Sequence, residues 1–112
     1  MTALNLQNCN TLAGSVSALS LDEARHYIQQ LDPIWQINAE QQSISQRYEF
    51  ENFYQTIAFV NVIAQIAHQQ DHHPALQVSY KQCTVTYSTH SVGGLSLCDF
   101  ICAAKINAAQ TL

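Results

Sequence analysis

Histidines are the residues of this sequence best suited to chemistry, and four of the five lie within positions 68–90. His72 and His73 are adjacent and precede Pro74, whereas His90 comes just before a pair of glycines. An imidazole can both accept and donate protons near neutral pH, because its unperturbed pKa is about 6.5. Several imidazoles around one pocket could therefore protonate a leaving group and remove a second proton without a nucleophile.

Each residue of this cluster also has a simpler interpretation. His68 and His72 are four apart, a helical spacing that is common among surface and interface residues. His90 could be a solvated residue at the end of a strand. Asp71 favours local turns, and Asp99 suits the start of a helix. The clustering, rather than any single residue, favours an acid–base site.

A metal site is the competing chemical interpretation of the same cluster. His68, His72 and His90 with a carboxylate would suit zinc or iron. However, the glutamate of an HExxH motif is missing and no further ligand spacing stands out. We therefore expect no metal.

The four cysteines form no CxxC pair. Cys98 and Cys102 are spaced as neighbours on one helix face, whereas Cys9 and Cys83 are distant from them in the sequence. A disulfide framework or a zinc site would need closer pairing. We expect four unpaired cysteines that serve as small buried hydrophobic residues in a reducing cytosol.

Length and charge exclude several classes of protein. A chain of 112 residues predicts one domain, and 47% apolar residues with a net charge of −4 favour folding over disorder. Only four Lys and Arg are present, too few for phosphate contacts to nucleic acid or for a polybasic membrane segment. Residues 1–20 have no basic residue and no continuous apolar stretch, so no signal peptide or membrane anchor is expected. We expect a soluble, cytoplasmic protein.

Capping signals predict three helices. A capping box at residues 20–23 begins a helix that reaches about residue 31 and ends before Pro33. Asn52 can cap a second, longer helix. A further capping box at residues 96–99 opens a last helix that reaches about residue 108.

Alternating apolar and polar residues predict strands over 35–37, 44–50, 76–80 and 83–89. The resulting order, helix–strand–strand–helix–strand–strand–helix, predicts an α+β domain. We expect a four-stranded antiparallel sheet with three helices on one face. The domain should cover residues 20–112, after a weakly structured N-terminal segment at residues 1–19.

The helix that follows Asn52 carries two apolar stripes, which are Phe53, Ile57, Val60, Ala64 and Ala67, and Phe59, Val62, Ile63 and Ile66. A helix that is apolar on two faces is buried on two faces. In a domain of this size the second face would meet a partner subunit. We therefore expect a homo-oligomer.

The histidine cluster resembles the signature of the pterin-4a-carbinolamine dehydratase family, in the form His68-x3-His72-His73-Pro74-x5-Tyr80-x9-His90-x8-Asp99. The resemblance extends over residues 20–108, and the following residues also fit: Trp35, the run Tyr48-x-Phe50-x2-Phe53, and Ser88-Thr89-His90 before Gly93-Gly94-Leu95. Two positions depart from the pattern. His68 stands where the family usually has Glu, and Ile34 stands where glycine often precedes the tryptophan.

The resemblance implies a hydro-lyase that dehydrates a 4a-hydroxytetrahydropterin to a quinonoid dihydropterin and water. Such an enzyme recycles the pterin of aromatic amino acid hydroxylases, and a hydroxylase is a conceivable protein partner. The resemblance also implies the α+β fold described above, a homodimer or homotetramer, and no metal or organic cofactor.

The roles of the family carry over residue by residue. His72 and His90 match the histidines that act as general acid or base. His73 matches the histidine that mainly holds the pterin and belongs to the catalytic set. Asp99 matches the carboxylate near the strand histidine. The expected substrate contacts are His73, Asp99, His68 and Asp71.

A non-catalytic function on the same fold is the main alternative. Eukaryotic relatives also stabilise dimers of a homeodomain transcription factor, and some bacterial relatives resemble Rubisco assembly factors with degenerate sites. The intact His-His-Pro sequence, His90 and Asp99 favour retained chemistry in this chain.

Overall fold

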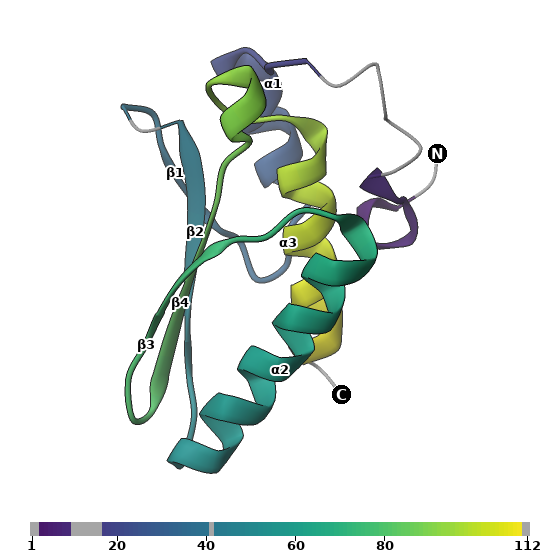
Figure 1. Cartoon of the computed structure of the whole chain (residues 1–112). Helices are drawn as coiled ribbons and strands as arrows, with labels where there is room; N and C mark the ends of the chain where they lie inside the picture. Colours follow the sequence, from purple (N-terminus) through teal and green to yellow (C-terminus); the bar gives the residue numbers. More distant parts are fainter. Residues whose placement is uncertain (1–2, 10–16, 41, 111–112) are drawn as a thin grey trace.

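Three helices cover one face of a four-stranded antiparallel sheet in the computed structural model, which describes residues 3–9, 17–40 and 42–110 (Figure 1). This architecture and the order of its main elements confirm the prediction from the sequence. The elements are η1 (Leu4–Leu6), α1 (Leu21–Ile28), β1 (Gln36–Asn38), β2 (Ser43–Glu49), α2 (Phe53–Gln70), β3 (Ala75–Val78), β4 (Gln82–Tyr87), η3 (His90–Val92) and α3 (Leu97–Gln110).

The strands lie in the order β1-β2-β4-β3, so β2 and β4 form the centre of the sheet. Their register pairs Ile44 with Tyr87 and Tyr48 with Cys83. Every second side chain of β4 points toward the helices, and these side chains, Cys83, Val85 and Tyr87, are fully buried. Strand β4 thus contributes side chains to the core. It is followed directly by residues 88–90, which include the predicted site residue His90.

The predicted caps of the first two helices are present. Ser20 and Glu23 form both bonds of a capping box at the start of α1. The Asn52 side chain accepts a hydrogen bond of 2.9 Å from the Gln55 amide and begins α2. Helix α1 ends at Ile28, earlier than expected.

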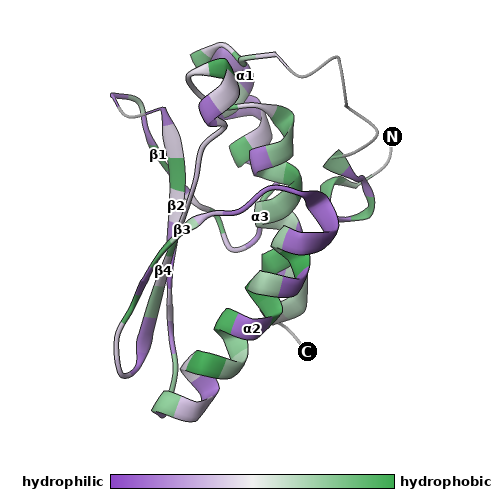
Figure 2. Ribbon diagram, viewed as in Figure 1, coloured by the Kyte–Doolittle hydropathy of each residue, from purple (hydrophilic) through white to green (hydrophobic). Residues whose placement is uncertain are grey.

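Helix α3 lies at the centre of the core, and apolar residues occur along both α2 and α3 (Figure 2). A polar cluster fixes the C-terminal half of α3. The buried Asn107 side chain accepts hydrogen bonds from Trp35 Nε1 at 3.0 Å and from the Tyr48 hydroxyl at 2.5 Å. Its amide nitrogen donates to the Pro33 carbonyl at 2.9 Å. These bonds hold α3, and with it Asp99, at a defined position against the sheet.

Only one of the two predicted stripes of α2 is buried within the chain. Phe59, Ile63 and Ile66 face the core, whereas Val62 from the same predicted stripe is 40% exposed. The other stripe stays partly or fully exposed, and we call it the α2 apolar flank: Phe53, Ile57, Val60, Ala64 and Ala67.

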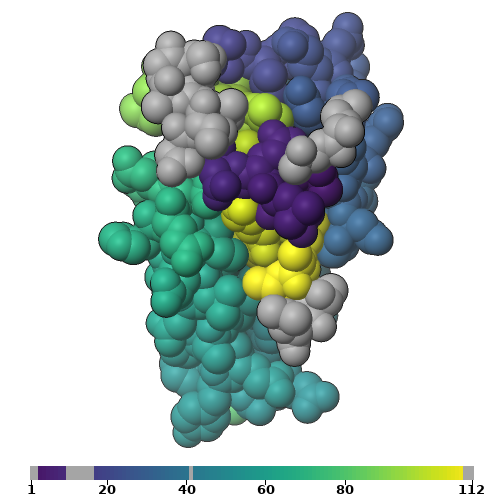
Figure 3. Space-filling view, turned by 90° about the vertical axis from the view of Figure 1, so that its right-hand side faces the viewer, coloured from purple at the N-terminus to yellow at the C-terminus, as the bar shows by residue number. Residues whose placement is uncertain are grey.

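The N-terminal residues 3–9 lie against α3 (Figure 3). Leu4 and Cys9 are buried there, and the Cys9 amide donates to the Gln70 side chain at 2.7 Å. Part of the N-terminal segment, residues 1–19, that was expected to be weakly structured therefore packs on the core. Its residues 1–2 and 10–16 lie outside the described residues.

A disulfide joins Cys9 to Cys98 across 89 positions of sequence. The expectation of four unpaired cysteines is therefore wrong for these two residues. Cys83 and Cys102 are unpaired and buried, as expected. Sequence spacing did not indicate the bond, because the partners come together only when residues 3–9 pack on α3.

Across the ranges that the structure describes, no helix is both long and apolar enough to cross a bilayer.

Candidate active site

A pocket of about 500 Å³ opens between the end of α2, the end of β4 and η3. Its volume lies within the range that small-molecule sites occupy. It unites two segments that the sequence analysis singled out separately, and its lining residues are Asp71, His72, His73, Pro74, Ala75, Thr86, Ser88, Thr89, His90 and Ser91.

The C-terminal end of α2 directs the paired histidines to this pocket. Asp71 adopts the left-handed conformation with φ of 51°, which aspartate tolerates better than most residues. The His72 amide then donates to the Ala67 carbonyl at 3.1 Å, as in a Schellman motif. Pro74 then disfavours helical geometry at His73, so the chain continues in extended form into β3, which begins at Ala75.

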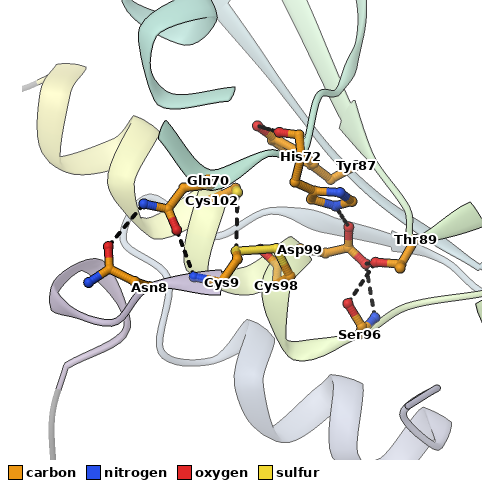
Figure 4. The surroundings of a disulfide bond; sticks show 10 residues. All are labelled: Asn8, Cys9, Gln70, His72, Tyr87, Thr89, Ser96, Cys98, Asp99 and Cys102. Carbon is orange, nitrogen blue, oxygen red and sulfur yellow. Dashed lines mark hydrogen bonds and ion pairs between the residues drawn. A yellow bond between two sulfur atoms is a disulfide. The ribbon is translucent and has the colours of Figure 1, made fainter. Parts of the chain in front are cut away.

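His72 is held by a buried carboxylate. Its Nε2 atom lies 2.6 Å from Oδ1 of Asp99, which is completely buried in the first turn of α3 (Figure 4). The other oxygen, Oδ2, accepts hydrogen bonds from the Thr89 hydroxyl at 2.7 Å and from the Ser96 amide at 2.9 Å. The start of a helix also favours negative charge. Both oxygens of the buried carboxylate are thus engaged, and one of them holds the His72 ring.

Tyr87 fixes the plane of the His72 ring. The two rings stack with centroids 5.2 Å apart and an interplanar angle of 27°. Burial raises the pKa of the Tyr87 hydroxyl above its usual range, so this group stays protonated. His72 is thus oriented through its ring face and through Nε2.

The remaining predicted site residues differ in how they are placed. His73, His90 and Asp71 are exposed and line the same pocket as His72. His68 is exposed on the last turn of α2 and is not among the residues that line the pocket. Asp99 is bonded to His72 and also to Thr89, the residue next to His90.

Three residues of the site were not predicted from the sequence to be site residues: Tyr87, Thr89 and Ser96. Thr89 continues the inward-facing parity of β4, and a polar residue at such a position is a signal that was available. Ser96 was recognised only as part of a capping box with Asp99. In the structure that box is half formed: the Ser96 amide donates to the Asp99 side chain, whereas the Asp99 amide donates to the Ser96 carbonyl at 3.1 Å and the Ser96 hydroxyl contacts Thr89 at 2.6 Å.

The histidines do not form a metal-ligand set in the structure. Among the described residues, the one group of potential ligands that converges is Cys9, Cys98 and Cys102. Two of these sulfur atoms are joined in the disulfide. The competing set of His68, His72 and His90 therefore lacks the convergence that a metal centre needs.

Comparisons with known proteins agree on one family. The family model described as pterin 4 alpha carbinolamine dehydratase matches residues 17–109. A Nitrosomonas eutropha protein that carries the provisional name pterin-4-alpha-carbinolamine dehydratase is 46% identical, with 90% of this chain and 88% of the relative covered. A Legionella pneumophila protein with the same provisional name is 40% identical, with 93% and 92% covered.

Solved structures also resemble this chain. A Brucella melitensis protein described as a transcriptional coactivator/pterin dehydratase superimposes with a TM-score of 0.77 at 30% identity, covering 82% of this chain and 97% of that protein. A pterin dehydratase-like protein identified as a RuBisCO assembly factor in the alpha-carboxysome shares the fold, with a TM-score of 0.57 and 20% identity. The coverage is 66% of this chain and 86% of that protein.

Proposed function

The chain belongs to the pterin 4 alpha carbinolamine dehydratase family, and on this premise we propose that it is a hydro-lyase that dehydrates 4a-hydroxytetrahydropterins. The products would be a quinonoid dihydropterin and water. The observation that carries this proposal is the pair formed by His72 and the buried Asp99 beside a pocket that also presents His73 and His90. The resulting cycle would return the pterin of aromatic amino acid hydroxylases to use.

The reaction needs one proton donor and one proton acceptor. The C4a–O bond breaks, and the oxygen leaves as water when an imidazolium protonates it. The N5–H bond breaks as a base removes its proton, and that electron pair forms the C4a–N5 double bond. Asp99 would stabilise the protonated form of His72, and His90 or His73 would serve the second proton. Asp71 would contact the substrate from the pocket lining, and His68 would do so only from outside that lining.

The composition of the pocket suits a neutral, planar bicyclic substrate. A pterin carries no phosphate or carboxylate, so its binding requires no cationic clamp. The pocket lining contains imidazoles, hydroxyl groups and one carboxylate, but no Lys or Arg. Its volume of about 500 Å³ accommodates a ligand of this size.

The first test is the dehydration of freshly generated 4a-hydroxytetrahydropterin, followed by absorbance. The protein should exceed the buffer rate, and His90→Ala should lower its kcat by about 10²-fold, the lower end of general acid–base contributions. His26→Ala is the matched control, because His26 is exposed on α1 and does not line the pocket. A wild-type rate equal to the buffer rate would rule out the enzyme.

A homodimer or homotetramer is the second part of the proposal, and the α2 apolar flank supports it. Phe53 is 43% exposed and stacks on Tyr80, which is 64% exposed, so this apolar surface extends beyond the helix. Light scattering should show an oligomer that Ala64→Glu dissociates. Gln69→Glu adds the same charge to an exposed position on another side of α2 and should leave the mass unchanged.

The exposed α2 apolar flank is also the one observation that specifically favours the alternative, a non-catalytic protein-binding function. A monomeric wild-type protein would leave the flank available to a different partner, such as an aromatic amino acid hydroxylase or an assembly client. Capture of a stoichiometric protein partner by His72→Ala as well as by wild type would then favour a binding function. Loss of the oligomer in Ala64→Glu would favour self-association.

A further inference from the structure

We propose that Thr89 is a positioning residue that sets which nitrogen of His72 carries out proton transfer. The Thr89 hydroxyl holds the Asp99 carboxylate so that Oδ1 engages Nε2 of His72. Nδ1 is then the nitrogen that remains for the substrate. This inference deepens the proposed function, on which its kinetic part rests.

The direction of each hydrogen bond around Asp99 follows from its partners. A carboxylate only accepts hydrogen bonds, so the single proton of the Thr89 hydroxyl must point to Oδ2 of Asp99. The contact of 2.6 Å between the hydroxyl groups of Thr89 and Ser96 must then use the proton of Ser96. The chain of donors therefore runs from Ser96 to Thr89 to Asp99.

Asp99 receives donors from three sides and is fully buried. The Ser96 amide and the Thr89 hydroxyl both occupy Oδ2, which leaves Oδ1 for His72. A buried carboxylate without the Thr89 bond would lose one of its two side-chain partners and part of its orientation. Bonds to charged groups are also among the strongest in proteins.

The backbone holds Thr89 rigidly enough for this role. Its amide donates to the Gly94 carbonyl at 2.7 Å, and its carbonyl accepts from Val92 at 3.1 Å. Thr89 and Gly94 also form an isolated β-bridge. The hydroxyl is thus fixed by the closed loop that contains η3 rather than by the rotamer alone.

The consequence for His72 is a defined tautomer. Neutral His72 must carry its proton on Nε2, because Oδ1 of Asp99 can only accept. Nδ1 has no hydrogen-bond partner among the residues that the structure describes, and His72 lines the pocket. Proton transfer through Nδ1 is therefore the arrangement that the Thr89–Asp99 bond maintains.

The decisive experiment is ¹⁵N NMR of histidine-labelled protein without substrate. Wild-type His72 should show the Nε2–H tautomer in its neutral form. Thr89→Val should move His72 toward a mixture of tautomers, and Thr89→Ser, which keeps the hydroxyl, should restore the wild-type spectrum. Thr89→Ala, which avoids a methyl group beside the carboxylate, is the second hydroxyl-free variant and should match Thr89→Val.

Dehydration kinetics provide a second test, in which the Thr89 and Ser96 variants are ranked by kcat. Thr89→Val should lower kcat by about tenfold or more, as expected for loss of one bond to a charged group, with little change in KM. Thr89→Ser should recover most of kcat. Ser96→Ala should cost less than Thr89→Val, because Ser96 only donates to Thr89 and does not reach Asp99 through its hydroxyl.

Two outcomes would overturn the inference. One is a wild-type His72 tautomer in both Thr89→Val and Thr89→Ala, and the other is a Ser96→Ala effect on the tautomer as large as that of Thr89→Val. Absence of dehydration by every variant and by wild type, together with the expected NMR spectra, would remove the proposed function alone. The positioning role of Thr89 would then stand.

Discussion

Replacing Asp99 with asparagine is expected to lower the dehydration rate by about 10²- to 10⁴-fold while the protein keeps its fold. Asparagine has the shape of aspartate, and its oxygen can still accept from Thr89 and from the Ser96 amide. Its NH₂ group would then face Nε2 of His72, where the carboxylate oxygen lies at 2.6 Å in the wild type. A donor in that place forces the His72 proton onto Nδ1 and removes the charge that stabilises the imidazolium.

This result would be measured as kcat and kcat/KM in the absorbance assay, with the fold checked by the thermal unfolding midpoint. Asp22→Asn is the matched control, because Asp22 is exposed in the first turn of α1 and lies outside the pocket. Its rate should stay within about twofold of wild type, as is usual for exposed positions. An Asp99→Asn rate within threefold of wild type would show that the His72–Asp99 pair is not part of the chemistry.

Reduction of the disulfide should lower the free energy of unfolding by about 4 kcal/mol. The bond between Cys9 and Cys98 closes a loop with a sequence separation of 89, and a cross-link over such a loop restricts the unfolded chain strongly. Urea unfolding with and without a dithiol reductant measures the difference. The Cys9→Ala variant should unfold like the reduced wild type and should not respond to reductant.

Cys102 makes Cys9→Ala a cleaner variant than one at Cys98. Its sulfur lies 3.8 Å from that of Cys9, so loss of Cys98 could let Cys102 take its place. Within the intact protein such exchange is slow, since burial raises the pKa of the Cys102 thiol to about 12 and thiolate is the attacking species. Four free thiols by intact mass before reduction, or an unchanged urea midpoint afterwards, would contradict the disulfide.

Local signals predicted the fold well because each depends on residues close together in the sequence. The capping box at Ser20 and Glu23 and the cap at Asn52 mark helix starts that the structure confirms. The alternation of Cys83, Val85 and Tyr87 reported which side of β4 faces the core. The α2 helix shows the limit of this approach, since its periodicity revealed two apolar stripes but not which of them the chain itself buries.

Such local signals could not predict contacts between residues that are far apart in the sequence. Cys9 pairs with Cys98 only because residues 3–9 dock on α3, and no spacing rule relates the two positions. The carboxylate of Asp99 bonds to His72, 27 positions away, and sequence spacing did not indicate this pair. The contact between the Ser96 and Thr89 hydroxyl groups was likewise not indicated by the capping pattern at residues 96–99.

The sequence by itself determined the kinds of groups available for catalysis, the order of helices and strands, and the family signature of His72, His73, His90 and Asp99. Residue types and the periodicity of apolar residues are local properties of a chain, so they can be identified from the sequence alone. Only the tertiary structure decided that Thr89 and Asp99 orient His72 and that His68 lies outside the pocket lining. Those pairings depend on how α2, β4 and α3 pack together, and packing fixes side-chain partners at distances that sequence separation does not encode.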